Sequence, residues 1–500
     1  MIEMSLAEVA AVTAGRLHRA TGAERVTAVE FDSRRVGPGG LFLALPGERA
    51  DGHDFAAAAA AAGAAAVLAA REVDAPAVIV PPAEAGSPAA PNPLAGSYLA
   101  ATDPDGSGAA VLAALARLAA HNVGALPDLT VVGVTGSSGK TSTKDLLAAV
   151  LAPLGPTVAP PGSFNNELGL PWTALRADAT TRHLVLELSA RGAGHIAALC
   201  RVAQPRIGVV LNVGRAHLGE FGSPEAIAAA KGELVEALPG HGVAVLNADD
   251  PAVAAMASRT RARVLTVGRS PGADVRADDV VLDAGRARFR LVAAQGTADV
   301  ALRLVGAHHV GNALAAAAVA LECGATPEGV AAALSGAAPA SRWRMEVTDR
   351  PDGVTVVNDA YNANPESMRA ALQALASVGA GSSGLRSGAG PSGLRSGHST
   401  RRTWAVLGRM AELGEQSAAA HAETAAVAAQ LGVDELVTIA APEYGTGRAV
   451  ADVAAALELL HAELEPGDVV LVKASRAAGL DRLADALLGE HSAAKREPVA

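Results

Sequence analysis

The stretch that decides the fold is TVVGVTGSSGKTST, residues 130–143. Residues 130–134 are mostly apolar and predict a buried strand, and a helix is expected to begin with Lys144 after the glycine-rich turn. Such a turn lets backbone N–H groups converge on phosphate oxygens, and the N-terminus of the helix adds a favourable dipole. The spacing is tighter than the strict G-x-x-x-x-G-K-T form because position 134 is Val. The predicted phosphate-binding residues are Gly136, Ser137, Ser138, Gly139, Lys140, Thr141 and Ser142.

Two residues of this turn would do specific chemistry. Lys140 would neutralise the β- and γ-phosphates of a nucleotide, and the Thr141 hydroxyl would reach Mg²⁺. The alternative is a glycine-rich turn with a solvated lysine. A strand before the turn and a helix after it favour phosphate binding.

The segments around this stretch predict α/β architecture. Downstream, residues 184–188, 207–211 and 243–246 are short apolar runs with few charges, which is typical of parallel strands covered on both faces. Residues 274–304 alternate polar and apolar side chains with glycine turns and predict antiparallel strands. The last third repeats the parallel pattern and predicts a second doubly wound unit, with strands at 354–357, 404–407, 435–439 and 469–472.

Upstream of the turn the pattern is more mixed. Short strands are expected at 41–45 and 78–80, with an alanine-rich helix near 56–70. A polar loop at 81–108 precedes a helix at 109–120. We therefore expect three α/β domains: a small domain at 1–126, a central P-loop domain with a mostly parallel sheet at 127–338, and a Rossmann-like domain at 339–500. The last domain contains a Gly/Ser-rich insertion, residues 379–400, in which SGLRSG occurs twice, and we expect it to be a flexible loop.

Composition excludes several classes of protein. The net charge is −10, whereas a protein that binds the phosphate backbone of nucleic acids is normally basic. The uncharged alanine-rich run of residues 55–70 is too short and too weakly apolar to span a bilayer, and the N-terminus shows no signal-peptide pattern. Two cysteines provide neither a disulfide framework nor a zinc cluster. We expect a cytoplasmic enzyme that binds neither nucleic acid nor membrane.

Three titratable residues follow the phosphate turn. Glu187 ends the predicted strand 184–188, His217 follows the strand 207–211, and Lys231 lies on a helix that begins after Ser223-Pro224-Glu225. Taken singly, each has an ordinary interpretation: a charge at a strand end, a loop histidine, a solvated lysine. Together they would suit two Mg²⁺ ions, but Mg²⁺ prefers oxygen ligands and a protonated lysine cannot be one. A neutral lysine that takes up CO₂ would become a carbamate with two anionic oxygens.

The chain resembles the Mur ligase family over nearly its whole length. The resemblance rests on eight stretches in order: 31–34 (FDSR), 51–55 (DGHDF), 136–141 (GSSGKT), 164–169 (FNNELG), 216–234 (AHLGEFGS through AKGEL), 341–346 (SRWRME), 358–365 (NDAYNANP) and 473–476 (KASR). The stretch 358–365 is typical of the member that adds D-Ala-D-Ala to UDP-MurNAc-tripeptide. Ser142 stands where a second Thr is common in the family, which preserves the hydroxyl.

The resemblance implies roles for individual residues. Lys140, Glu187, His217 and Lys231 would be catalytic, with Thr141, Glu187, His217 and the carbamate of Lys231 as ligands of two Mg²⁺ ions. Asn312 would contact the nucleoside of ATP, and Arg342 and Asp359 would close over its phosphates and ribose from the third domain. Ser33 and Arg34, with Asn165 and Asn166, would hold the UDP-sugar substrate; without the resemblance, the two asparagines read more simply as a cap for the following helix. Closure of the third domain implies a hinge near residues 337–341.

The implied reaction is an ATP-dependent amide ligation through an acyl phosphate, with UDP-MurNAc-tripeptide and D-Ala-D-Ala as substrates and a monomeric enzyme. Three alternatives stay open: another Mur ligase step, a ligase like folylpolyglutamate synthase, and a nucleotide-dependent scaffold with a degenerate site. About 125 residues precede the P-loop, and the folate enzyme lacks such a domain. The third residue of the accepted peptide, diaminopimelate or lysine, is not decided by the sequence.

Overall fold

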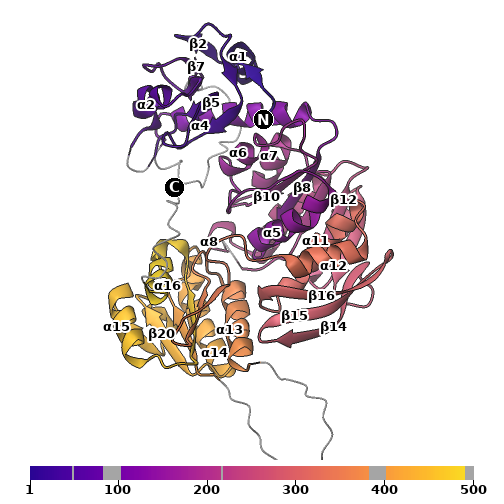
Figure 1. Cartoon of the computed structure of the whole chain (residues 1–500), viewed down its shortest axis with the longest axis vertical. Coiled ribbons are helices and arrows are strands. Elements are labelled where there is room, and N and C mark those ends of the chain that lie inside the picture. Colours follow the sequence, from indigo (N-terminus) through magenta and orange to yellow (C-terminus); the bar gives the residue numbers. More distant parts are fainter. Residues whose placement is uncertain (48–49, 83–102, 216–217, 382–400, 490–500) are drawn as a thin grey trace, which may run out of the picture.

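The computed structural model describes residues 1–47, 50–82, 103–215, 218–381 and 401–489. Figure 1 shows three lobes along the long axis of the molecule, in the order of the sequence: indigo at one end, magenta in the middle and yellow at the other end. Each lobe is built on its own sheet, so the α/β class expected from the sequence is confirmed. The domain limits at 126/127 and 338/339 stay predictions.

The N-terminal lobe has a five-stranded sheet in the order β2-β7-β6-β5-β4. Its strands β4 to β7 pair in parallel, and β2 joins β7 in antiparallel orientation. A two-stranded sheet of β1 and β3 lies beside it. The bounds are β1 Met4–Ser5, β2 Arg16–His18, β3 Arg25–Val26, β4 Ala28–Glu30, β5 Gly40–Leu43, β6 Ala66–Ala69 and β7 Ala77–Ile79.

The helix expected near 56–70 is wrong in its second half. Helix α2 covers only Ala56–Ala61, and the chain then enters strand β6. Gly63, at φ +104°, breaks the helix there because this backbone conformation suits glycine. Alanine in Ala66–Ala69 forms a fully buried strand between β5 and β7, so tertiary pairing overrides its helical propensity.

The central lobe has a nine-stranded sheet in the order β16-β15-β14-β13-β12-β11-β8-β10-β9. Strands β8 to β14 pair in parallel, and β14, β15 and β16 form the antiparallel meander expected over 274–304. The bounds are β8 Thr130–Thr135, β9 Thr157–Val158, β10 His183–Glu187, β11 Ile207–Val210, β12 Val243–Asn247, β13 Arg263–Gly268, β14 Val275–Asp283, β15 Arg286–Ala293 and β16 Gly296–Val305.

The C-terminal lobe has a six-stranded sheet in the order β17-β18-β22-β19-β20-β21. Only β17 is antiparallel to its neighbour, so the doubly wound unit expected from the sequence is present. The insertion predicted at 379–400 lies, from residue 382 on, outside the described residues. The bounds are β17 Glu346–Asp349, β18 Thr355–Asn358, β19 Thr403–Leu407, β20 Glu435–Ile439, β21 Arg448–Val450 and β22 Val469–Lys473.

Helices cover both faces of the large sheets. The long, almost entirely buried α11 packs against α5, which follows the glycine-rich turn, and against α12. No helix of the described ranges is long and apolar enough to cross a bilayer. The bounds are α1 Leu6–Thr13, α2 Ala56–Ala61, α4 Ser107–Gly124, α5 Lys140–Leu151, α6 Gly169–Ala174, α7 His195–Val202, α8 Leu218–Phe221, α9 Pro224–Glu236, α10 Pro251–Ala254, α11 His309–Glu322, α12 Pro327–Gly336, α13 Pro365–Gly379, α14 Ser417–Gln430, α15 Val453–Glu463 and α16 Asp481–Leu487, with short 3₁₀ helices at Gly52–Phe55, Ala152–Leu154, Ala255–Arg259, Gly414–Gln416, Pro442–Tyr444 and Arg476–Ala478.

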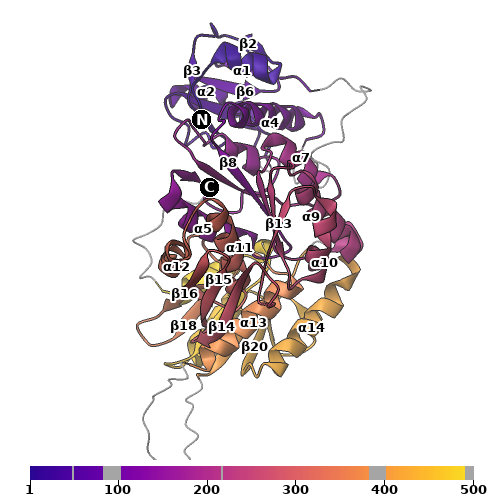
Figure 2. The same ribbon diagram turned by 90° about the vertical axis from the view of Figure 1, so that its right-hand side faces the viewer.

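The first two lobes are joined by α4 and an aromatic contact. Figure 2 shows α4 between the N-terminal lobe and the central lobe, where α6 and α7 pack against it. Trp172 of α6 lies between the rings of Phe31 and Phe164, at 5.5 and 4.9 Å between centroids. Its indole N–H donates to the carbonyl of Val29 at 3.0 Å. The loop that contains Phe31 is therefore fixed against the central lobe.

Candidate active site

The glycine-rich turn joins β8 to α5 at the carboxyl edge of the central sheet. Helix α5 begins at Lys140, one turn earlier than expected, with Gly139 as its N-cap at φ +81°. A Cβ atom on Gly139 would lie 2.7 Å from Oδ1 of Asn312, so glycine is required here for both backbone and space. Ser138 donates its backbone N–H to Oδ1 of Asn212 at 3.0 Å, at the end of β11. The neighbouring strand therefore holds the turn in shape.

Lys140 folds back onto its own turn. Its Nζ donates to the carbonyl of Gly136 at 2.7 Å. Desolvation lowers the pKa of Lys140, and the charge of Arg344 lowers it further, while Glu187 opposes both effects. An anion at the mouth of the turn would relieve the desolvation of this ammonium group.

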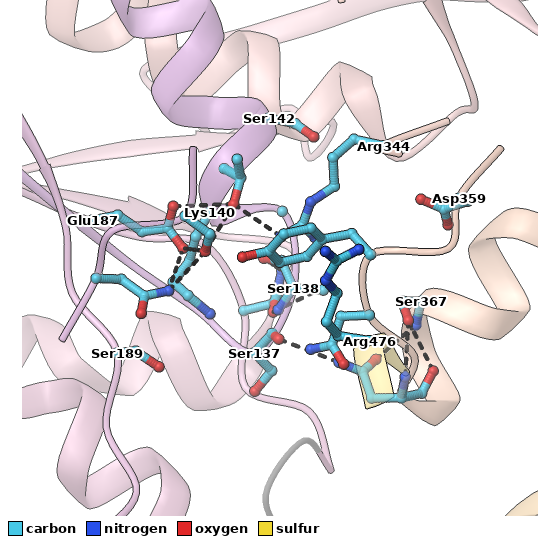
Figure 3. Close-up of a pocket in the computed structure, with 18 of the residues that line it drawn as sticks. Ser137, Ser138, Lys140, Ser142, Glu187, Ser189, Arg344, Asp359, Ser367 and Arg476 are labelled. Carbon is cyan, nitrogen blue, oxygen red and sulfur yellow. Dashed lines mark hydrogen bonds between the residues drawn. The ribbon is translucent and has the colours of Figure 1, made fainter. Parts of the chain in front are cut away.

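Glu187 is the centre of a polar cluster. Its side chain is almost wholly buried, with the residue 1% exposed, and it accepts hydrogen bonds on both oxygens. Thr141 donates at 3.0 Å to one oxygen, and Ser163 and Asn165 donate to the other at 3.0 and 2.8 Å. Figure 3 shows Glu187 and Lys140 on the same side of the pocket. Oxygen ligands of this kind suit Mg²⁺, so Thr141 and Glu187 fit the predicted metal site.

The two predicted substrate asparagines have local partners. Asn165 bonds to Glu187 and to Ser163, while Oδ1 of Asn166 accepts the backbone N–H of Gly169 at 2.9 Å, at the start of α6. Asn166 therefore contacts the start of the following helix, as the simpler interpretation expects. The side chains of Asn165 and Asn166 both line the same pocket.

Lys231 lies on α9, whose N-cap is Ser223, as expected from the sequence. The residue is 5% exposed and has no hydrogen-bond or ion-pair partner within the described ranges. Burial, and to a lesser extent the like charge of Lys140, lowers the pKa of its amine to about 7. Its side chain is not among those that line the pocket. A large neutral fraction of this amine is therefore present at neutral pH.

His217 and the residue before it lie outside the described residues, so its predicted role as a metal ligand stays a prediction. Among the described residues, no three His, Cys, Asp or Glu side chains converge as a ready metal site. If a metal binds near Glu187, the remaining ligands must therefore include hydroxyl groups, water, a carbamate or a residue outside the described ranges.

The C-terminal lobe closes the pocket from the other side. Asp359 follows β18, accepts the backbone N–H of Met345 at 3.1 Å, and pairs with Nζ of Lys473 at 2.6 Å. Burial lowers the pKa of Lys473, although Asp359 opposes this effect. Lys473 was not among the predicted site residues. Its position at the carboxyl end of β22, where ligands bind in open α/β sheets, was the signal that would have found it.

The predicted residue Arg342 does not line the pocket, whereas Arg344 does. Arg342 is half exposed, stacks on the ring of Trp343 at 5.1 Å and lies 4.0 Å from the carboxylate of Asp485. Arg344 reaches across to the central lobe, where it donates to Oγ1 of Thr141 at 3.2 Å (Figure 3). Arg342 and Arg344 are two residues apart in the stretch 341–346, and nothing in the sequence shows which of the two reaches the pocket.

The start of α11 forms the back of the pocket. Asn312 is buried beside Gly139, and its Nδ2 lies 3.3 Å from Nδ1 of His309. His308 lines the pocket. His309 is buried, and burial lowers its pKa well below the usual value, so it is neutral at pH 7; neither histidine was predicted as a site residue.

Ser33 and Arg34 lie apart from this pocket. Arg34 is exposed and pairs with Asp32 at 2.8 Å, on the loop whose Phe31 contacts the central lobe. Neither residue lines the pocket, so their predicted contact with the UDP-sugar would be made on a surface of the N-terminal lobe.

The central and C-terminal lobes together enclose a pocket of about 380 Å³. Its walls combine the phosphate-type turn, a buried carboxylate and cationic side chains from both lobes, which is the arrangement required for phosphoryl transfer. The predicted site residues that line it are Ser137, Ser138, Gly139, Lys140, Thr141, Ser142, Asn165, Asn166, Glu187, Asn312 and Asp359.

Three family models match the chain. The model described as Mur ligase family, catalytic domain, matches residues 25–120, and the Mur ligase middle domain matches residues 134–320. The Mur ligase, glutamate ligase domain, matches residues 343–385 and 392–476. The three matches follow the three lobes in order.

Full-length relatives agree with these matches. The UDP-N-acetylmuramoyl-tripeptide–D-alanyl-D-alanine ligase of Mycobacterium tuberculosis H37Rv is 55% identical, with 100% of each chain covered. The ligase of the same name from Escherichia coli K12 is 34% identical over 97% of this chain and 99% of that protein.

Solved structures are also similar over the whole length. MurF from Acinetobacter baumannii aligns with a TM-score of 0.79 and 29% identity, covering 98% of this chain and 99% of that one. MurF ligase from Thermotoga maritima in complex with ADP aligns with a TM-score of 0.73 and 29% identity, covering 94% and 99%. This chain belongs to the Mur ligase family.

Proposed function

We propose that this chain is an ATP-dependent ligase that joins D-Ala-D-Ala to UDP-MurNAc-tripeptide and so completes the cytoplasmic peptidoglycan precursor. The observation that supports the substrate pair best is the full-length match to relatives named for this reaction, at 55% and 34% identity. ATP as the co-substrate is supported by the similar Thermotoga maritima ligase, whose structure contains ADP, and by the turn at 136–141.

The chemistry follows from the low reactivity of a carboxylate toward amines. The terminal carboxylate of the tripeptide attacks the γ-phosphorus of ATP, a P–O bond to ADP breaks, and an acyl phosphate forms. The free amine of D-Ala-D-Ala then attacks the acyl carbon, giving a tetrahedral intermediate that expels phosphate and loses a proton. No protein nucleophile is needed, so the contribution of the protein is positioning and charge stabilisation, for which about 7–11 kcal/mol is a general ceiling.

In this proposal, residues of both lobes act on the phosphates. Lys140 leaves the carbonyl of Gly136 for a phosphate oxygen, and Arg344, rather than Arg342, supplies the cation from the C-terminal lobe. Asp359 and Asn312 would contact the nucleoside, and the ion pair with Lys473 would hold Asp359 in place. Ser33 and Arg34 would bind the UDP end of the substrate, and Asn165 and Asn166 would line the path of its peptide.

The metal side of the pocket would be formed by Thr141, Glu187, His217 and Lys231. Bound Mg²⁺, in two ions, would neutralise negative charge on the phosphates. The neutral amine of Lys231 can form an N–C bond to CO₂ with loss of one proton, and the resulting carbamate has two anionic oxygens. The low pKa and missing partner of Lys231 support this step.

The test is turnover by the purified protein with each substrate omitted in turn. ADP and phosphate are measured together, and the ligated product is identified by mass spectrometry. We expect turnover only with Mg²⁺, ATP, UDP-MurNAc-tripeptide and D-Ala-D-Ala all present, by a monomer. Equal turnover with a single D-amino acid would contradict the proposal and favour another Mur ligase step. Parallel substrates with diaminopimelate or lysine as third residue decide which peptide is accepted.

A further inference from the structure

Arg344 is presented to the pocket by a strained turn. The residues on either side of it both have left-handed backbones, Trp343 at φ +58° and Met345 at φ +50°. Non-glycine residues rarely adopt this conformation, and such strain is found most often at functional sites. The segment 359–361 holds the turn, because Asp359 accepts the N–H of Met345 and the N–H of Tyr361 donates to the carbonyl of Trp343 at 3.3 Å.

The guanidinium of Arg344 has few polar partners. Its Cζ atom lies 4.0 Å from the centroid of the Tyr361 ring, and one terminal nitrogen donates to Thr141. Its Nε is buried and has no hydrogen-bond partner among the described residues. Arginine has five N–H donors in a fixed plane, so most of its hydrogen-bonding capacity is unused here. The face of the aromatic ring, more than any acceptor, sets the position of the group.

Tyr361 also lines the pocket, but neither apolar packing nor its hydroxyl explains the position of its ring. The residue is half-buried, belongs to none of the apolar clusters of the C-terminal lobe, and its hydroxyl has no hydrogen-bond partner within the described ranges. A ring that packed for stability would be expected inside such a cluster, and a tyrosine used for its hydroxyl would be expected to bond through it.

We propose that Tyr361 is a positioning residue whose ring holds Arg344 over the phosphate turn before ATP enters. The attraction is that between a cation and the negative face of an aromatic ring, and it is strongest where water is excluded. This inference rests on the proposed function, because it takes Arg344 as a contact of the ATP phosphates. It makes the segment 359–361 responsible both for the turn that presents Arg344 and for the direction of its side chain.

The experiment compares Tyr361→Phe, which keeps the ring, with Tyr361→Leu, which removes it. Affinity for a non-hydrolysable ATP analogue with Mg²⁺ is measured by calorimetry, and KM is measured for all three substrates. Tyr361→Phe should stay within about twofold of the unchanged protein. Tyr361→Leu should weaken the analogue by about tenfold, which corresponds to about 1.4 kcal/mol, and leave KM for the peptide substrates within about twofold.

Two further measurements isolate the contact with Arg344. In the Arg344→Gln background, Tyr361→Leu should cause no further loss, because the cation on which the ring acts is absent. Phenylalanine analogues with increasing fluorination at position 361 keep the shape and weaken the negative face, so affinity should fall stepwise. This series also serves if Tyr361→Leu does not fold.

Three outcomes would overturn the proposal: equal losses in Tyr361→Phe and Tyr361→Leu, additive losses in the double variant, or no response to fluorination. The first would mean that the hydroxyl touches a ligand. Analogue binding needs neither peptide substrate, so a failure of the ligation assay in the unchanged protein would overturn the proposed function and leave this binding test intact.

Discussion

Two regions of the central lobe each bury a lysine, and they treat it in opposite ways. At the foot of α5, Lys144 is 2% exposed and is fully partnered: it pairs with Asp145 and donates to the carbonyl of Pro160 at 2.9 Å and to Oγ of Ser341 at 3.2 Å. On α9, Lys231 is 5% exposed and has no such partner among the described residues.

The difference distinguishes a lysine that stabilises the fold, Lys144, from one that is proposed to react, Lys231. A buried ammonium is stable only with anions and acceptors around it. Lys144 has them, and through Ser341 it ties the phosphate-binding helix to the segment 337–341, where we predict the hinge. Lys231 lacks them, so burial lowers the pKa of its amine to about 7 and a large fraction of the amine is neutral and nucleophilic at neutral pH. Burial alone therefore does not mark a lysine as a candidate for chemistry, whereas burial without partners does.

The largest effect is expected at Lys231. Lys231→Ala should lower ligation by about 10³-fold or more, because the proposed carbamate ligand would be lost from the site of charge development. Thermal unfolding should change little, because no partner is left unpaired. Small carboxylates such as formate should restore part of the activity, measured as phosphate release.

Ammonium or methylamine serves as the control for that rescue. Recovery with an amine would show that position 231 acts as a cation on the phosphates. Full activity of the Lys231→Ala protein would show that Lys231 is a buried side chain without a role in ligation.

The second effect concerns stability at the partnered lysine. Lys144→Met keeps the alkyl volume but leaves Asp145 without its buried cation, so we expect a loss of about 3 kcal/mol of unfolding free energy. The matched change Lys231→Met removes no partner and should cost less than about 1 kcal/mol. Denaturant unfolding of the two variants measures the difference, and equal losses would break the comparison.

Much of this fold was predictable from local pattern. The runs at 207–211 and 243–246 contain few polar residues, as buried parallel strands do, and they form such strands in the structure. The alternating segment 274–304 forms the antiparallel meander. The error at 56–70 has a physical cause: alanine favours helix locally, but the position of β6 between β5 and β7 is set by pairings across the lobe.

The site was predictable where one segment contains it and less so where two lobes meet. Lys140 and Thr141 begin the helix after β8 and Glu187 ends the neighbouring strand β10, and the structure brings them together. Arg344 and His308 enter the pocket from turns, which distant hydrogen bonds such as that between Met345 and Asp359 hold in shape, whereas Lys473 ends β22. Nothing in the periodicity of the sequence reports those bonds.

A polar network around Asp51 adds a test of partnered charges that depends on pH. In the N-terminal lobe, burial would raise the pKa of Asp51, but hydrogen bonds from His53 and Arg71 outweigh it and lower the pKa to about 2. A lowered folded pKa means stability that is present above pH 4 and is lost as the pH falls toward 2. Since Asp51 is partly exposed, we expect about 1 kcal/mol.

Asp51→Asn should therefore lose about 1 kcal/mol at pH 7 and show a shallower acid dependence below pH 4 than the unchanged protein. Chemical unfolding between pH 2 and 7 measures this difference. Parallel acid profiles for the two proteins would show that Asp51 gains no stability from its partners.

The smallest effect is expected in the insertion, whose Gly/Ser-rich sequence predicts no buried charge, with or without partners. Gly379 and Arg401 are joined by a backbone hydrogen bond of 2.9 Å, so the ends of the segment lie together. Replacing residues 381–399 by a short Gly/Ser turn should keep activity within about twofold, because loop-closure entropy changes slowly with length. Residues 382–400 lie outside the described ranges, and a loss of folding or activity would show that they bind or pack.

The central claim, that a partnerless buried amine becomes a carbamate, is tested most directly by ¹³C NMR. The protein is equilibrated with ¹³C-bicarbonate and compared with Lys231→Ala and with Lys144→Met. We predict one carbamate carbonyl resonance in the unchanged protein and in Lys144→Met, and none in Lys231→Ala. A spectrum of the unchanged protein without that resonance, or one that keeps it in Lys231→Ala, would contradict the claim.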